Sequence, residues 1–424
     1  RIVCRMEYFM NQSFMKEKPV FPLLTSMALP MVISMLVNSL YNIIDSFFVA
    51  QISEQAMTAL SLVYPVQNLI NAIAIGFGVG MNALIALCLG AGDVKNADRA
   101  ATHGMLFSVM HGIVITVVSI SIMPFFLSLF TKDTEVLQLG TRYASIAFSF
   151  SLIIMLGLAF EKIFQAVGNM KITMAALLCG CITNIILDPL LIFGMFGFPK
   201  MGIAGAAVAT VSGQIMAALI VMKKGFRKSP HRQVYPHHIA KIFQLGIPNI
   251  LMQSAYTFYI LGLNLILATF SDQAVTALGL YYKWQTFFFI PLGAMQTCIV
   301  PVISYNYAAR NIERCKKTLS ASIVFGMSLM ALGTLCFVCI PSQMLRVFTS
   351  DELVIAIGRV GFRFVGISFL PMVTSLIFPV FFQAVGSSLK SSLLTVIRTV
   401  VLFVPLAYLF SRILLWRRWL PFIR

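Results

Sequence analysis

Three carboxylates inside long apolar stretches are the residues of this chain with the clearest capacity for chemistry. The sequence contains 14 Asp and Glu residues, most of which fall in polar loops or near the termini. Only Asp45, Glu161 and Asp188 lie within apolar runs. A carboxylate at the centre of a membrane-spanning helix costs about 3 kcal/mol. Each of these groups must therefore bind a proton, pair with a cationic side chain or coordinate a metal ion.

Polar neighbours suggest that two of the carboxylates share a site. Tyr41 and Asp45 are four residues apart, as are Asn184 and Asp188, so each pair shares one face of a helix. The two aspartates lie at similar predicted depths. Two carboxylates, an amide and a phenol offer the oxygen ligands that a hard cation such as Na⁺ prefers. The carboxylates could equally share protons, because each raises the proton affinity of the other at low dielectric constant.

Glu161 allows two interpretations. Its predicted depth is closer to the cytoplasmic side than that of Asp45 or Asp188, yet it could still be a third acid of the same network. Lys162 follows it directly and offers a structural ion pair instead. Both interpretations remain open from the sequence.

The composition places these residues in an integral membrane protein. Hydrophobic residues make up 59% of the chain and charged residues 11%, against about 25% charged residues in soluble proteins; the mean hydropathy is +0.90. We predict an all-α polytopic protein, because apolar runs of about 20 residues can each cross a membrane as a helix. The predicted spans are residues 22–49, 57–89, 101–129, 139–167, 172–196, 203–222, 243–269, 275–304, 318–340, 353–385 and 390–411.

The sequence repeats itself at an offset of 218 residues. The segment 54–60 (EQAMTAL) returns as 272–278 (DQAVTAL), and FQAVG at 164–168 returns at 382–386. An offset that covers six spans returns the chain to the same side of the membrane, so the two copies share one orientation. We therefore predict two six-helix lobes, residues 1–222 and 243–424, joined by a cytoplasmic linker at 223–242. All three buried acids fall in the first copy.

Basic residues set the predicted orientation. The net charge is +17, and Lys and Arg concentrate in alternate loops, including the N-terminus, residues 223–241 and residues 310–317. By the positive-inside rule, the N-terminus and the linker are cytoplasmic, in a multi-pass protein of the cell inner (plasma) membrane. These loops suit contact with anionic lipid. Because the basic residues follow the membrane topology, we predict no nucleic-acid partner.

The repeat also predicts a span that the sequence lacks. The first copy ends with 203–222, whose counterpart would occupy about 421–440, beyond Arg424. The segment 412–424 instead carries four arginines on the side expected to be poor in basic residues. We expect a missing twelfth helix through truncation or a frameshift. The alternative is a natural eleven-span protein whose tail lies along the interface, anchored by Trp416 and Trp419.

Other motifs have structural explanations. Gly76-Phe-Gly-Val-Gly80 resembles the start of a nucleotide-binding loop, but it lies inside a span and follows no strand, so it indicates close helix packing. His103 and His111 lack an evident ligand partner. The remaining residues offer no nucleophile, base and metal cluster at one depth, and we expect neither a cofactor nor an enzyme activity.

The chain resembles the multidrug and toxic compound extrusion (MATE) family, most closely its DinF-like branch, over about residues 20–411. The resemblance is carried by an ordered set of motifs: Leu29-Pro30 through Tyr41–Asp45 (YNIID), Gly90–Asp93 (GAGD), Phe164–Asn169 (FQAVGN), Asn184–Pro189 (NIILDP) and Gly202–Thr210 (GIAGAAVAT). Their order within a duplicated plan makes the resemblance specific.

The resemblance implies an antiporter that exchanges inward-moving H⁺ or Na⁺ for outward-moving amphipathic, often cationic, compounds by alternating access. We expect a monomer. The resemblance implies a first-lobe site for the coupling ion made of Asp45, Asn184, Asp188 and Thr210, with Tyr41 and Tyr143 nearby. Glu161 occupies a position where related proteins carry another polar residue, often Asn.

Two other functions compete with this interpretation. A flippase for lipid-linked precursors belongs to the same broad superfamily, but it is expected to have a cationic central cavity. A non-transporting truncated product is the second rival, because of the missing span. The buried acids of the first lobe favour the antiporter.

Overall fold

The structure of the protein, a computed structural model, describes residues 13–225 and 236–413. Every regular element in these ranges is a helix, as predicted. The central part of the predicted linker and the arginine-rich tail from residue 414 lie outside the described residues. The missing twelfth helix therefore stays an expectation.

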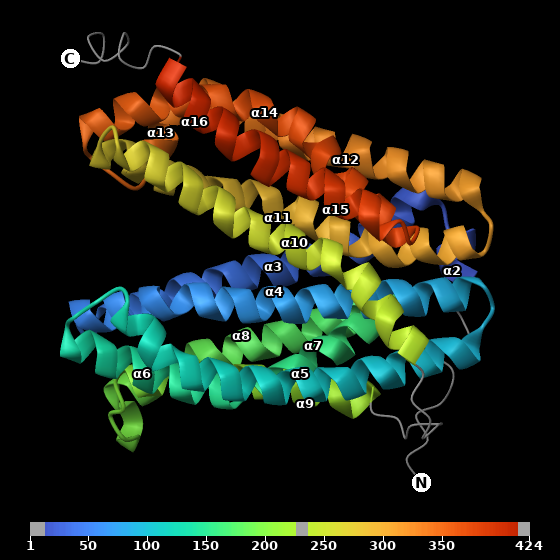
Figure 1. Ribbon diagram of the computed structural model, residues 1–424, viewed down its shortest axis with the longest axis horizontal. Helices are drawn as coiled ribbons and strands as arrows, with labels where there is room; N and C mark the ends of the chain where they lie inside the picture. Colours follow the sequence, from blue (N-terminus) through green and yellow to red (C-terminus); the bar gives the residue numbers. More distant parts are fainter. Residues whose placement is uncertain (1–12, 226–235, 414–424) are drawn as a thin grey trace.

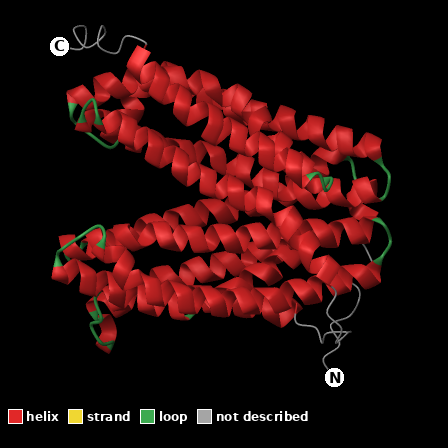
Figure 2. Cartoon of the chain, viewed as in Figure 1, coloured by secondary structure: helices red, strands yellow, loops and turns green. Residues whose placement is uncertain are grey.

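The helices of the two halves follow one another with short connections (Figure 2). The first half contains α2 (Ser13–Glu17), α3 (Val20–Ala50), α4 (Glu54–Gly90), α5 (Val94–Ser128), α6 (Thr134–Ser149), α7 (Ser151–Ala166), α8 (Met170–Phe193), the short η1 (Met195–Gly197) and α9 (Ile203–Gly225). The second half contains α10 (Pro236–Ala268), α11 (Asp272–Ala308), α12 (Ile312–Cys339), α13 (Pro341–Arg346), α14 (Glu352–Ala384), α15 (Ser388–Val396), η2 (Ile397–Phe403) and α16 (Val404–Ile413).

The predicted spans match these helices. Ten described helices are long and apolar enough to cross a membrane, and α6 with α7 forms one further span that is bent by 48°. The last span runs through α15, η2 and α16, and η2 is a π-helix. The protein is thus a multi-pass helical membrane protein.

Helix boundaries repeat at the same offset as the sequence. Helices that start at residues 54, 94, 134 and 170 have counterparts that start at 272, 312, 352 and 388. The N-caps repeat too: Ser53 and Ser271 each accept a hydrogen bond from the backbone N–H three residues on, at 3.0 and 3.1 Å. Asp133 and Asp351 cap the helices that start at residues 134 and 352, each accepting at 2.8 Å from the N–H two residues on. Equivalent caps fix equivalent helix starts in both copies.

One cap lies in a basic loop at the predicted cytoplasmic end. Asp93 accepts hydrogen bonds from the backbone N–H of Asn96 at 3.0 Å and from its side-chain amide at 2.6 Å. These bonds stabilise the ionised carboxylate, and they hold the pKa of Asp93 below its usual value. The loop thus starts α5 with a charged cap.

The two halves form separate bundles that lie close together at one end and diverge at the other (Figure 1). The first half packs against the second mainly through α4 with α10 and α11, and through α3 with α11. At the close end, the rings of His103 (α5) and His238 (α10) stack with centroids 5.8 Å apart. Asn306 on α11 also donates to the carbonyl of Met15 on α2, at 3.0 Å. The loops at this end are the basic ones.

The glycines of the 76–80 motif let α4 of the first bundle pack closely against α10 of the second. A Cβ atom on Gly80 would lie 2.1 Å from the carbonyl oxygen of Ile242, and one on Gly76 would lie 2.9 Å from the backbone nitrogen of Ile250. Gly246 faces them from α10, where a Cβ atom would lie 2.6 Å from the oxygen of Gly76. The interpretation of this motif as a close-packing surface is confirmed.

We expect Gly80→Ala to weaken the contact between the bundles. Its added methyl group would overlap the backbone of α10, and such overpacking costs about 1–3 kcal/mol. The control is Gly279→Ala on α11, where a Cβ atom meets nothing within 4 Å and the better helix propensity of alanine applies. Thermal unfolding of the purified protein should show a lower melting temperature for Gly80→Ala only. Equal melting temperatures would contradict this packing.

Candidate cation site

Asp45 and Asp188 meet inside the first bundle, where α3 packs against α8. Asp45 is 8% exposed and Asp188 is fully buried. Their carboxyl groups lie close enough to interact directly. Each also has a buried Oδ1 atom with no hydrogen-bond partner among the described residues. Two adjacent buried carboxylates cannot both stay ionised without a positive charge, so the pair suits a proton or a small cation.

Asn184 and Thr210 complete one side of this pair. The amide orientation that satisfies its neighbours lets Asn184 donate to Asp188 Oδ2 at 3.1 Å and accept from Thr210 Oγ1 at 3.3 Å. Two glycines allow this geometry: a Cβ atom on Gly213 of α9 would lie 2.6 Å from the carbonyl oxygen of Gly180 on α8. Small residues let the two helices approach closely, which brings Thr210 to Asn184.

Two tyrosines lie near the same carboxylates. Tyr143 on α6 is 2% exposed, and its phenol is close to Thr210 and in the neighbourhood of Asp45 and Tyr41. Tyr41 stands one helical turn before Asp45 on α3 and is close to both aspartates. The sequence-predicted residues other than Glu161 therefore come together from four helices of the first bundle.

Glu161 takes part in a different cluster. Its Oε1 atom lies 3.3 Å from Lys162 Nζ and accepts a hydrogen bond of 2.7 Å from Gln165. Lys162 in turn donates to Gln165 Oε1 at 2.9 Å. All three side chains are buried. The geometry favours the structural ion pair over a third acid of the cation site.

A bend separates the helix of Tyr143 from the helix of Glu161. Phe150, between α6 and α7, has φ −102° and ψ 13°, which is outside helical geometry. The serines on either side hydrogen-bond back to backbone carbonyls, Ser149 to Ser145 at 2.5 Å and Ser151 to Phe148 at 2.7 Å. Such bonds compete with the helical ladder and bend helices. The counterpart helix α14 is continuous.

Sequence reasoning missed two partners of Lys162. Gln165 lies four residues after Glu161, a spacing that could have indicated a shared helix face. Gly78, the middle glycine of the 76–80 motif, makes room for the aliphatic part of Lys162: a Cβ atom there would lie 2.6 Å from Lys162 Cγ. The charged pair is thus packed between α7 and α4.

The second bundle has no equivalent of the acid pair. The positions that match Asp45, Glu161 and Asp188 at the 218-residue offset are leucine, proline and leucine. It carries a partly buried cation instead: Arg398 of η2 donates to the backbone oxygen and the hydroxyl of Ser375 on α14, at 2.8 and 3.1 Å. Within the described spans, the buried carboxylates therefore all lie in the first bundle.

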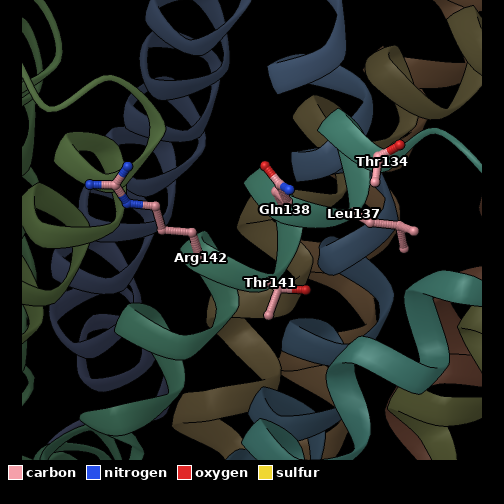
Figure 3. A pocket seen from close by; sticks show the side chains of 5 residues that line it. All are labelled: Thr134, Leu137, Gln138, Thr141 and Arg142. Atoms are coloured by element: carbon pink, nitrogen blue, oxygen red, sulfur yellow. The ribbon is translucent and has the colours of Figure 1, made fainter.

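A shallow surface hollow on α6 is separate from the acid pair. Figure 3 shows its lining residues, which all come from this one helix: Thr134, Leu137, Gln138, Thr141 and Arg142. Tyr143 follows Arg142 directly, but adjacent helical residues point about 100° apart, and Tyr143 is buried whereas Arg142 is exposed. The hollow therefore lies on a different face of α6 from Tyr143.

The chain is similar to known transporters over nearly its whole length. It is 25% identical to the multidrug export protein MepA of Staphylococcus aureus (strain MRSA252), covering 94% of this chain and 89% of that protein. MepA of Staphylococcus haemolyticus (strain JCSC1435) is 24% identical, covering 94% of this chain and 88% of that protein.

Solved structures share the fold. An outward-facing multidrug resistance MATE family transporter of the MOP superfamily matches with a TM-score of 0.88 and 23% identity, covering 95% of this chain and 91% of that one. A MOP superfamily transporter from Pyrococcus furiosus Vc1 (DSM3638) matches with the same score, identity and coverage.

The family model covers both copies of the repeat. The model named MatE matches residues 30–190 and again residues 248–409. These ranges include the acid pair in the first copy and the corresponding helices in the second. The chain therefore belongs to the MatE family, the multidrug and toxic compound extrusion transporters, which is a family of transporters and not of enzymes.

Proposed function

We propose that this protein exports amphipathic, cationic drugs or toxic metabolites in exchange for H⁺ or Na⁺. The names of the MepA relatives and the family support multidrug export. The observation that carries the coupling is the buried Asp45–Asp188 pair, whose unpartnered oxygens would be satisfied by a proton or a small cation. Carboxylate, amide and hydroxyl oxygens are suitable ligands for Na⁺.

Alternating access requires that the coupling ion bind the two conformations with different affinity. The acid pair is suited to this because its ligands come from α3, α6, α8 and α9, whose relative positions an ion would fix. Helix α3 also packs against α11 and α12 of the second bundle. A shift of α3 on ion binding would thus reach the contact between the bundles.

The arrangement of the bundles supports an outward-open state. They diverge at the end opposite the basic loops (Figure 1), and the positive-inside rule assigns those loops to the cytoplasm. We infer an orientation in the cell inner (plasma) membrane with the N-terminus inside. The acid pair favours export over a lipid-linked precursor flippase, for which a cationic cavity is expected.

Removing either carboxylate should abolish coupled export. Asp45→Asn and Asp188→Asn each remove a charge from a buried site, and a lost partner of this kind costs about 2–5 kcal/mol, or about 30-fold or more in ion affinity. Cells expressing either variant should accumulate ethidium like cells without the protein. Glu135→Gln, which alters an exposed acid in the same bundle, should export like the wild type.

Measuring ethidium efflux from proteoliposomes that contain the wild type or either aspartate variant identifies the coupling ion. Efflux of ethidium is measured with an imposed H⁺ gradient and, separately, with an imposed Na⁺ gradient at equal pH. The wild type should respond to at least one gradient, and the two aspartate variants to neither. If the wild-type protein responds to neither gradient, the result supports the rival interpretation that this chain does not transport. If both variants export ethidium normally, the acid pair does not bind the coupling ion.

Glu161→Gln should destabilise the protein without being required for coupling. Breaking a buried ion pair on one side leaves an uncompensated charge and costs about 3–5 kcal/mol. The double variant Glu161→Gln with Lys162→Met removes both charges and keeps an apolar stem against Gly78, so most of the stability should return. Thermal melting and gradient-driven efflux are measured together. A stable double variant that no longer responds to the ion gradient would make Glu161 part of the cation site.

A further inference from the structure

The short helix α2 contacts both bundles at the end where they lie close together (Figure 1). On the side of the first bundle, the side chains of Phe14 and Met15 fill the space beside Gly168, in the loop between α7 and α8. A Cβ atom on this glycine would lie 2.6 Å from Phe14 Cζ and 2.7 Å from Met15 Cε. Gly168 has φ +74°, so the missing side chain permits both the turn and the contact. Met15 is fully buried as a result.

Hydrogen bonds attach the same helix to the second bundle. The carbonyl of Met15 accepts from Asn306 Nδ2 of α11 at 3.0 Å and from Arg314 Nε of α12 at 2.8 Å. The Nη2 atom of Arg314 also donates to the carbonyl of Lys18. The last carbonyls of a helix have no partner within the helix, and a nearby arginine can satisfy them. Arg314 therefore caps the C-terminal end of α2 and ties it to α12.

The repeat shows that this attachment is not part of the architecture that the two copies share. At the 218-residue offset, the positions of Asn306 and Arg314 hold cysteine and asparagine in the first copy. The counterpart of Gly168 is Gly386, which has φ +83° and where a Cβ atom would meet nothing within 4 Å. The left-handed turn thus recurs in both copies, but α2 covers the turn of the first copy only.

A helix that contacts both bundles resists their separation. Gly168 belongs to the first bundle, whereas Asn306 and Arg314 belong to the second. If the bundles move apart at this end, α2 cannot keep both sets of contacts. Hydrogen bonds from a charged donor and the burial of Phe14 and Met15 both favour the closed arrangement. The contacts of α2 therefore add to the free energy needed to open the end that carries the basic loops.

We propose that α2 is a strap between the bundles, which stabilises the state closed at the basic end and has to detach from one bundle before that end opens. This role rests on the alternating access of the proposed function and adds an element that sets the balance between its two states. A contact made in one state only shifts the populations by the free energy of that contact. Weakening the strap should therefore increase the fraction of molecules that are open at the basic end.

Hydrogen–deuterium exchange measured by mass spectrometry tests the strap on purified protein in nanodiscs, without substrate or ion gradient. Arg314→Met removes the donors to α2 and keeps an apolar stem. The lost hydrogen bonds should change the ratio of the two states by about tenfold. Backbone amides at the close end, in residues 76–90 and 239–250, should then exchange faster. Amides at the other end of the same helices, in residues 54–64 and 260–268, should exchange more slowly.

A matched pair of glycine variants tests the other side of the strap. Gly168→Ala should act in the same direction as the arginine variant, because its methyl group would overlap Phe14 and Met15. Gly386→Ala places alanine in the same kind of left-handed turn but meets no atom within 4 Å. Lys316→Met controls for the loss of a positive charge, because Lys316 is exposed on α12. Both controls should exchange like the wild type at the two ends.

Thermal melting checks that each variant is folded, and Arg314→Met carries the test if Gly168→Ala does not fold. Faster exchange at the close end without slower exchange at the other end would mean that α2 only packs there, and would overturn the strap. Unchanged exchange in Arg314→Met, or the same response in the controls, would overturn it too. Because this measurement needs neither export nor a coupling ion, a failure of the ethidium assays would contradict the proposed function and leave this result unchanged.

Discussion

The free-energy cost of leaving a polar group unpaired in hydrocarbon determines how this structure is built. Backbone groups cannot be left unpaired in the membrane, and the described chain meets this demand with helices whose side-chain caps lie in the loops. Charged side chains obey the same rule. Lys162 is held by Glu161 and Gln165, and Arg398 by Ser375. Asp45 and Asp188 differ from these cations, since each retains a buried carboxylate oxygen without a partner among the described residues. A proton or a small cation could pair with a buried oxygen of this kind.

The duplication provides a scaffold in which chemistry is unequal. Helix starts and caps recur at one offset, yet the three carboxylates inside spans all belong to the first copy. The bend between α6 and α7 is also confined to the first copy. Matching caps keep the two copies alike in architecture, while their buried side chains differ.

The contact between the bundles depends on two helices of the first half, α4 and α3. Glycines at positions 76, 80 and 246 bring α4 and α10 together near the basic loops. The approach depends on positions without a side chain, because a Cβ atom at Gly80 or Gly246 would overlap the backbone of the facing helix. Helix α3 adds a second connection, because it carries Asp45 and packs against both bundles.

The sequence alone determined the class of the protein, the spans, the repeat and the residues gathered around Asp45 and Asp188. Apolar length sets a span, and spacing pairs Tyr41 with Asp45 and Asn184 with Asp188. Thr210 and Tyr143 were expected only from the family resemblance. Tertiary structure decided what spacing cannot show. It separated Glu161 from the acid pair, gave Lys162 a place against Gly78, and brought Thr210 of α9 to Asn184 of α8. Such contacts depend on how helices cross, because only packing decides which of several polar faces meet at one depth.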